Sequence, residues 1–287
     1  MNQLSLDQPQ EISVGVGLRS QHHEDFLLQT PKTVSWVEVI SENFMPWKKD
    51  GWGSDIEILK RIRQNLPVAL HGVSMNLGSA SPLDRDYLER LKKLITVIEP
   101  TVISDHLSWT GVGNLNSHDL LPLPYTSEAL ENIIGKIQKA QDFLGRKMLI
   151  ENPSSYLEFS ASEIPETEFI KTVVKRTGCS LLLDVNNVFV CSVNHGFAPE
   201  TYLRELQGCD IGQLHLAGHT NMNGHLIDTH DQPVAPEVWN LYRIAFELYG
   251  PKPTMIERDD HIPSWGELES ELANIKEVAH GASIIAS

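Results

Sequence analysis

The sequence predicts an α/β fold in which eight parallel strands, each followed by a helix, close into a single (β/α)8 TIM barrel. First, eight short, mostly continuous apolar runs recur along the 287 residues, as is typical of strands buried on both faces of a parallel sheet. Second, helical segments separate these runs, and eight such units in roughly 270 residues match the size of a closed barrel. The predicted strands are 13–19, 34–41, 68–74, 101–108, 147–152, 180–187, 211–218 and 254–259.

The segments between the strands have the pattern of amphipathic helices. In "PLDRDYLERLKKLITVIEP", apolar residues recur with a helical period at Leu88, Leu91, Leu94, Ile95 and Ile98. In "TSEALENIIGKIQKAQDFLG", Thr126 or Ser127 is placed to cap the start of a helix and Gly145 to end it. Both segments therefore fit the helical half of a strand–helix unit.

No Pro, Gly or Ser-rich linker divides the chain, so we expect one domain. Its bounds are residues 12–280, preceded by a flexible arm (1–11) and followed by a tail (281–287). An open, doubly wound sheet is the alternative, but no GxGxxG motif follows the first strand and the count of eight favours closure.

Composition excludes several classes of function. The net charge of -15, from 38 acidic and 23 basic residues, argues against nucleic acid as a partner because phosphate binding needs a basic surface. No apolar run approaches the roughly 20 residues of a membrane span, and the first residues do not form a signal peptide. Three cysteines without a CxxC pair fit a reducing, cytoplasmic setting.

Polar residues gather where six of the predicted strands end. Barrel enzymes assemble their active sites at the carboxyl ends of the strands, so these side chains should meet at one mouth. A single strand-end histidine is more often a hydrogen-bonded core residue, but this many imidazoles and carboxylates together favour a metal site. The residues are His71, Asp105, His106, Glu151, Asn152, Asp184, Asn186, Asn187, His215 and Glu257.

The loop after the seventh predicted strand adds to this set. In "DTHD", Asp228 and His230 are two residues apart, so in extended chain both would point toward one ion. Imidazole and carboxylate ligands without cysteine suit iron, manganese or zinc. There are more candidate ligands than one four-coordinate ion can bind, which indicates two or three metal ions.

Other residues near the mouth have more than one interpretation. His219 could be a ligand, a substrate contact or a support for a ligand, and His195 could line the mouth or cap the next helix. His261 fits either the rim or a substrate contact. Residues 108–124 form a long polar insertion, which we expect to be a loop or small hairpin over the site.

Eight segments together resemble the multinuclear non-haem iron-dependent oxidase family, which includes the methanobactin biosynthesis oxidase. They occur in the family's order and the resemblance covers about residues 12–280. It implies a TIM barrel related in shape to xylose isomerase and endonuclease IV. The segments are "LHGVSMNLGS", "SDHLSW", "IENPSSYL", "LLLDVNNVFV", "NHGFAP", "LHLAGH", "DTHDQPV" and "IERDDHIP".

The resemblance also implies a chemistry: two or three iron ions, in mixed Fe(II) and Fe(III) states, would use dioxygen as co-substrate to oxidise cysteines of a ribosomally made precursor peptide. It implies a separate partner protein that captures the leader of that peptide. By the same resemblance His71 and His106 would hold one iron. The implied ligands of the others are Glu151, Asp184, His215, Asp228, His230 and Glu257, with Asn187 as a further ligand.

Asp105 and His195 would then support the ligands or lie on the substrate side, and His219 is assigned with them as a candidate catalytic residue. Two other classes of function remain open from the residues alone. One is a zinc- or manganese-dependent hydrolase or sugar isomerase with the same ligands. The other is a metal-binding protein without catalysis.

Overall fold

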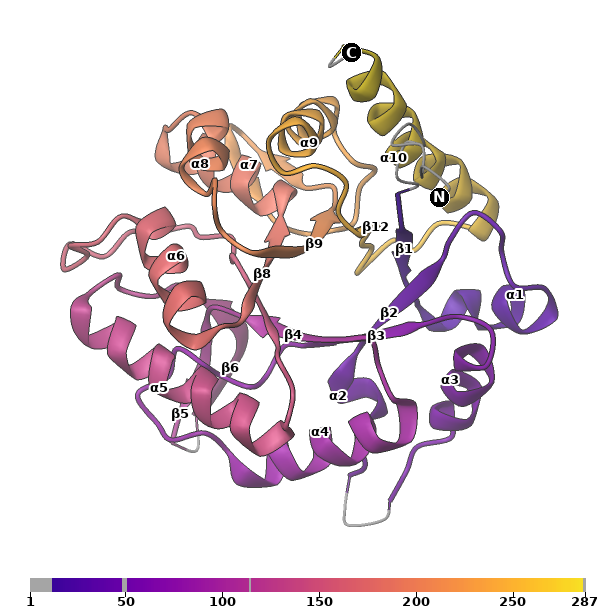
Figure 1. Cartoon of the computed structure of the whole chain (residues 1–287), viewed down its shortest axis with the longest axis horizontal. Coiled ribbons are helices and arrows are strands. Elements are labelled where there is room, and N and C mark those ends of the chain that lie inside the picture. The colour runs from indigo at the N-terminus through magenta and orange to yellow at the C-terminus, as the bar shows by residue number, and fades with distance from the viewer. Residues whose placement is uncertain (1–11, 48–50, 114, 286–287) are drawn as a thin grey trace, which may run out of the picture.

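The strands of the barrel close into one parallel sheet in a computed structural model, which describes residues 12–47, 51–113 and 115–285. The order around the ring is β1-β12-β9-β8-β7-β4-β3-β2, and Figure 1 shows the helices arranged around its outside. The barrel strands are β1 (Val14–Gly17), β2 (Trp36–Ile40), β3 (Val68–Gly72), β4 (Val102–His106), β7 (Leu149–Glu151), β8 (Ser180–Asp184), β9 (Ile211–Leu216) and β12 (Thr254–Ile256). The predicted fold class is confirmed, and each of the eight predicted segments contains one strand of the barrel.

The helices lie between these strands in the chain, as predicted. They are α1 (His23–Leu28), α2 (Ser41–Phe44), α3 (Asp55–Arg63), α4 (Arg85–Ile98), α5 (Ser127–Leu144), α6 (Glu166–Thr177), α7 (Val185–His195), α8 (Pro199–Glu205), α9 (Pro236–Tyr249) and α10 (Trp265–Ile285), with a 3-10 turn η1 (Ser20–His22). Among the described helices, none is long and apolar enough to cross a bilayer.

The caps of α5 show how the sequence sets the ends of a helix. The Thr126 hydroxyl accepts a hydrogen bond from the Ala129 N–H, and Gly145 ends the helix at a φ of 69°. The first contact satisfies an N–H that has no partner within the helix, and a positive φ is readily adopted only by glycine. Of the two predicted capping residues, Thr126 is the one used.

Two small hairpins interrupt the alternation at the mouth of the barrel. The insertion after β4 folds as β5 (Trp109–Val112) and β6 (Leu115–Leu121), which pair antiparallel and confirm the predicted hairpin. The loop after β9 forms β10 (Thr220–Met222) and β11 (His225–Ile227). These hairpins enlarge the end of the barrel where the predicted site lies.

The ends of the domain differ in part from the prediction. The tail expected from residue 281 is helical up to Ile285, as the last turn of α10. Nothing in "GASII" stops a helix outright, because a glycine in a helix interior costs only about 1 kcal/mol relative to alanine. The predicted flexible arm, residues 1–11, lies outside the described residues.

Candidate metal centre

The register of the barrel brings the predicted ligands side by side at the carboxyl ends of the strands. His106 on β4 is directly opposite Glu151 on β7, and Asp184 on β8 is opposite His215 on β9. All four side chains are buried. They therefore converge because neighbouring parallel strands end at the same level, as the sequence predicts.

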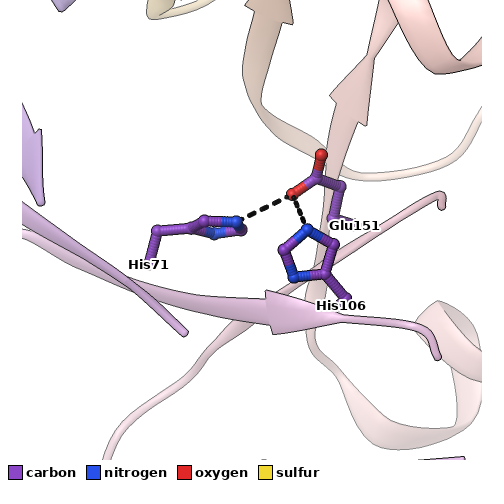
Figure 2. Close-up of side chains that lie close together, drawn as sticks. All are labelled: His71, His106 and Glu151. Carbon is purple, nitrogen blue, oxygen red and sulfur yellow. Dashed lines mark ion pairs between the residues drawn. The ribbon is translucent and has the colours of Figure 1, made fainter. Parts of the chain in front are cut away.

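The first group consists of His71, His106 and Glu151 (Figure 2). The Nε2 atoms of His71 and His106 lie 3.1 Å and 3.4 Å from the same oxygen, Oε2 of Glu151. That oxygen has no hydrogen-bond partner. Two imidazoles and a carboxylate therefore point at one small space inside the mouth.

The tautomer of His106 explains why this space favours a cation. Its Nδ1 lies 3.0 Å from the carbonyl oxygen of Gly72, which can only accept, so Nδ1 holds the proton of the neutral ring. Burial, with a smaller effect of His71, lowers the pKa of His106 well below its ordinary value, so the ring is neutral. Its Nε2 lone pair then faces the Glu151 carboxyl group, and this arrangement is stable with either a proton or a metal cation between the two acceptors.

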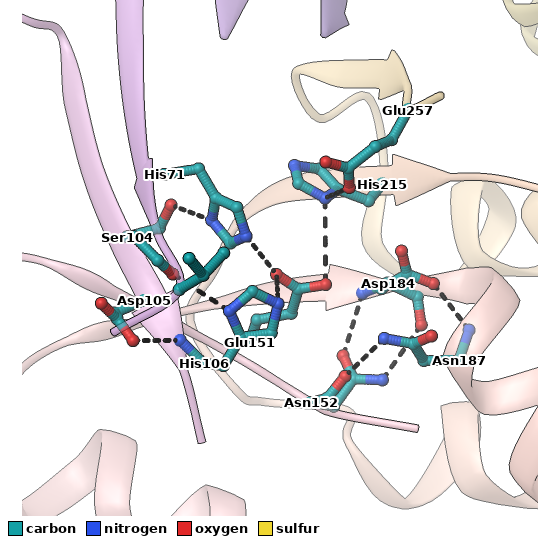
Figure 3. Close-up of polar contacts among 12 residues, drawn as sticks. His71, Ser104, Asp105, His106, Glu151, Asn152, Asp184, Asn187, His215 and Glu257 are labelled. Atoms are coloured by element: carbon teal, nitrogen blue, oxygen red, sulfur yellow. Dashed lines mark hydrogen bonds and ion pairs between the residues drawn. The ribbon is translucent and has the colours of Figure 1, made fainter. Parts of the chain in front are cut away.

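The second group shares Glu151 with the first and adds Asp184 and His215 (Figure 3). His215 Nδ1 lies 3.9 Å from Glu151 Oε1 and 3.3 Å from Glu257 Oε2. On its other side, His215 Nε2 lies 2.9 Å from Glu38 Oε1. A carboxylate behind a ligating imidazole fixes the orientation of the ring, so Glu38 is placed to support His215.

A third group, His230, Glu257 and Asp259, lies beside the second. His230 Nδ1 is 3.5 Å from Glu257 Oε2 and 3.2 Å from Asp259 Oδ2, while its Nε2 is 2.7 Å from Asp228 Oδ1. Asp228 and His230 do converge, but His230 has a φ of 49°, so a left-handed turn brings them together rather than the extended chain that was predicted.

Asp184 has two functions in the local structure. Its Oδ1 accepts a hydrogen bond from the Asn187 N–H at 2.6 Å and so caps α7, while its Oδ2 has no partner. The predicted strand over 180–187 is therefore wrong after Asp184, because this cap starts a helix and places Asn186 and Asn187 in its first turn. Asn187 Oδ1 is also buried without a partner.

Asn152 ties these elements together (Figure 3). Its amide donates to the Asp184 carbonyl at 3.0 Å and its Oδ1 accepts from the Asp184 N–H at 2.9 Å. Its own carbonyl accepts from the Asn187 amide at 3.1 Å. Because Asn187 donates through its Nδ2, its Oδ1 stays free to bind an ion.

The set of unpaired atoms provides a test of whether a metal fits. A buried polar atom without a partner costs about 1–3 kcal/mol, and native proteins hold few of them. Here they concentrate on the predicted ligands. Apart from the imidazole–carboxylate contacts given above, no hydrogen-bond partner is found among the described residues for Glu151 Oε2, Asp184 Oδ2, Asn187 Oδ1, His215 Nδ1, His230 Nδ1 and His230 Nε2. This donor set of oxygen and imidazole nitrogen fits iron, manganese or zinc.

The protonation of the carboxylates also reflects an excess of buried negative charge. Burial raises the pKa of Glu151 well above its ordinary value and that of Asp184 to about 7. Burial would raise the pKa of Glu257 too, but His215 and His230 outweigh it and hold that pKa well below the usual range. Arg19 adds a positive charge 3.1 Å from Glu257. Metal ions would take the place of the protons that this excess attracts.

The cavity at these groups is small, about 140 Å³. Ligands and a few apolar side chains line it, among them Leu120 from β6. The predicted insertion therefore does contribute a wall of the site. The lining residues are Ile40, His71, Val73, His106, Leu120, Glu151, Pro153, Ser154, Asn187, Asp228, His230, Glu257 and Asp259.

Asp105 lies behind the site rather than in it. It accepts hydrogen bonds from the N–H groups of Met75 at 3.1 Å and His106 at 2.8 Å, and it does not line the cavity. Consecutive strand residues point to opposite faces, and His106 takes the inward position. Asp105 is thus placed to position the strand end and not to touch a substrate.

His195 and His219 lie at the edge of the centre. His195 Nε2 is 2.8 Å from the Ser155 hydroxyl, and its ring lines a second, larger cavity. His219 Nδ1 is 2.8 Å from Asn186 Oδ1, and the Asn186 amide donates to Asp228 at 2.8 Å. His219 is therefore connected to the metal centre through Asn186. His261 is exposed at the rim.

Comparison with known proteins places this site in a family. Residues 13–280 match the family described as "RiPP precursor modification enzyme MbnB/TglH/ChrH". The chain belongs to this family. Curated members called "UPF0276 protein" are 52% identical over 267 residues in Rhizorhabdus wittichii and 49% identical over 258 residues in Caulobacter vibrioides. These alignments cover 93% and 90% of this chain and 94% and 91% of the relatives.

Solved structures support the fold. Endonuclease IV from Thermus thermophilus aligns with a TM-score of 0.61 at 15% identity, over 94% of this chain and 99% of the other. An L-ribulose 3-epimerase aligns with a TM-score of 0.60 at 13% identity, over 96% and 99%. The predicted family and its xylose-isomerase-like barrel are confirmed, and at these identities the likeness concerns the fold alone.

Proposed function

We propose that this family member is a multinuclear iron-dependent oxidase that uses dioxygen to modify cysteine residues of a ribosomally synthesised precursor peptide. The observation that carries the proposal is the sharing of Glu151 between two groups of buried ligands, in which Glu151 Oε2, Asp184 Oδ2 and His215 Nδ1 have no hydrogen-bond partner in the described part of the chain. A bridging carboxylate is what a site for adjacent metal ions needs. The family description supplies the class of substrate, a RiPP precursor.

The proposed ligands divide into three sets. His71, His106 and Glu151 would hold one ion, and Glu151, Asp184, His215 and Glu257 the next. Asp228 and His230 would hold the third, with Glu257 and Asp259 in reach. Asn187 offers a further oxygen. Iron bound there would supply the one-electron and dioxygen chemistry that amino-acid side chains lack.

Other residues would hold these ligands in place. Glu38 would fix the ring of His215, and the chain from His219 through Asn186 would fix the carboxylate of Asp228. Contacts that orient a ligand in this way typically change metal affinity by about 10–100-fold. Arg19 would offset part of the charge of Glu257 and Asp259.

The chain's own cysteines would not compete with the substrate thiol. Burial raises the pKa of Cys179 to about 11 and that of Cys191 to about 12, and the thiolate is the form that binds metals. None of the three cysteines lines the cavity. A thiolate at the site would therefore come from a substrate.

The test uses the precursor peptide and any small partner protein encoded beside the gene. Iron-loaded protein, the Cys-containing peptide and dioxygen are combined, and the peptide is analysed by mass spectrometry. We expect a mass change localised to cysteine that requires iron, dioxygen and Glu151. An unmodified peptide, or equal turnover with zinc in place of iron, would contradict the proposal and favour a hydrolase or isomerase.

A further inference from the structure

A second, larger cavity of about 730 Å³ lies next to the metal centre. The two share a wall, because Ser154 of the loop after β7 lines the small cavity and Ser155 lines the large one. Likewise, Leu120 lines the small cavity and Pro122 the large one. Neighbouring residues of the same two segments therefore line both cavities, so the cavities lie close together in the fold.

The second cavity contains a carboxylate among aromatic rings. The Tyr202 hydroxyl donates to Glu166 Oε1 at 2.6 Å, and Tyr125 also hydrogen-bonds to Glu166. The ring of Phe197 is stacked on Tyr202 with centroids 5.9 Å apart and planes 22° from parallel. We call Tyr125, Glu166, Phe197 and Tyr202 the aromatic-acid pocket.

The charges around this pocket have one sign. Three glutamates line the cavity, Glu158, Glu166 and Glu205, and no lysine or arginine is among its described lining residues. Burial raises the pKa of Glu166, although hydrogen bonds from Tyr202 and Tyr125 and the nearby His195 oppose this shift. A ligand that supplied a positive charge would stabilise the ionised form of Glu166, whereas an anion would be repelled.

We propose that the aromatic-acid pocket binds a cationic side chain, lysine or arginine, of the peptide substrate, close in sequence to the residue modified at the metal centre. The proposal rests on the proposed function for the identity of the substrate. A cation over an aromatic face and beside a partly buried carboxylate gains from both contacts, and about 1.4 kcal/mol of such preference corresponds to tenfold in affinity. Because Ser154 lines the small cavity and the next residue, Ser155, lines the large one, the proposal places one peptide across both.

The test measures binding of small probes to the purified, metal-loaded protein by titration calorimetry. The probes are N-acetyl-arginine amide, N-acetyl-lysine amide and N-acetyl-citrulline amide, the last an uncharged analogue of arginine. We expect at least one cationic probe to bind about tenfold more tightly than the citrulline probe. Equal affinities, or no saturable binding of either cationic probe, would overturn the proposal.

Variants locate the binding site. Glu166→Gln should lower the affinity for the cationic probe about tenfold. Glu168→Gln, the same change at an exposed position of the same helix, should leave that affinity unchanged. Phe197→Leu keeps apolar volume at a side chain that is 37% exposed, so the fold should persist while affinity falls several-fold. Unchanged affinity in both Glu166→Gln and Phe197→Leu would also overturn the proposal.

Metal content separates this proposal from the function on which it rests. None of the residues of the aromatic-acid pocket lines the small cavity, so Glu166→Gln should keep the metal of the wild type. In the precursor peptide, glutamine in place of the basic residue nearest the modified cysteine should raise KM about tenfold with kcat retained. An unchanged KM for each basic residue replaced would refute the pocket's role while leaving iron-dependent oxidation intact.

Discussion

Replacing Glu151 by glutamine tests whether one carboxylate serves two metal ions. Its Oε2 lies 3.1 Å and 3.4 Å from the Nε2 atoms of His71 and His106, and its Oε1 lies 3.9 Å from His215 Nδ1. Because Glu151 belongs to two of the three ligand groups, the variant should lose about two metal equivalents per chain, whereas His106→Ala should lose about one.

The Glu151→Gln variant should also lose thermal stability in proportion to the number of metal ions that it no longer binds. An ion at about a thousand times its Kd stabilises the folded state by about 4.1 kcal/mol. A chain of this size changes its Tm by about 2–4 °C per kcal/mol, so each lost ion lowers the Tm by roughly 8–16 °C. Without metal the variant should stay folded, because a glutamine N–H can donate to an imidazole lone pair that a carboxylate cannot satisfy.

The assay combines elemental analysis with calorimetric unfolding, with and without a chelator. The wild type and His106→Ala are the comparisons, and circular dichroism checks the fold of each. A Glu151→Gln protein that lost only as much metal as His106→Ala, with the same fall in Tm, would refute the bridging position of Glu151.

Three further predictions follow from the same geometry. Metal binding at pH 7 should release protons, because Asp184, with a pKa of about 7, must lose its proton to bind an ion. Calorimetry in buffers of different ionisation enthalpy measures this release, which should decline toward pH 9. Equal heats of binding in all buffers would contradict the prediction. His219→Ala should lower the affinity for the ion at Asp228 by about 10–100-fold in a metal titration and leave the affinity for the other ions unchanged. An equal loss of affinity for all ions would contradict this prediction. Gly218→Ala should lower the free energy of unfolding by about 1–3 kcal/mol in denaturant titrations, because its Cβ would lie 2.1 Å from a backbone oxygen. Gly135→Ala, where the added Cβ meets open space, should raise the free energy of unfolding by about 0.5–1 kcal/mol. Similar effects of the two substitutions would be inconsistent with this prediction.

The fold could be predicted almost completely because its signals are local and repeated. Each strand is a short apolar run, most of them buried on both faces, and some helices have local end signals, as α5 has at Thr126 and Gly145. The predictions that were wrong concern the ends of elements, where a single hydrogen bond can determine whether a strand continues or a helix starts. Asp184 starts α7 through its bond to Asn187, and this competes with continuing the strand.

The convergence of the candidate ligands could also be predicted, since strand ends of a parallel barrel meet. Glu38, Asp259 and Arg19 were not predicted. Glu38 lies inside the apolar run "VSWVEVIS", where a lone buried charge was the available signal. Arg19 joins the site because β1 and β12, which are far apart in sequence, pair in the closed barrel, and Asp259 joins it through contacts with Arg19 and His230.

The inward or outward direction of neighbouring polar residues does not follow from the residues alone, although the family resemblance assigns His106 to a metal and Asp105 to a supporting or substrate-side position. Asp105 and His106 are adjacent in the sequence, and both were candidates for the site. Only the strand pairing shows that His106 faces Glu151 while Asp105 accepts backbone N–H groups on the other side. A one-residue difference in register would exchange their positions.

Metal analysis and Mössbauer spectroscopy of anaerobically purified protein test the central proposal most directly. The shared carboxylate and the three ligand groups predict at least two irons per chain, with the magnetic coupling of ions that share a bridging ligand. Stoichiometric zinc, with no iron-dependent oxidation of a Cys-containing precursor, would contradict it.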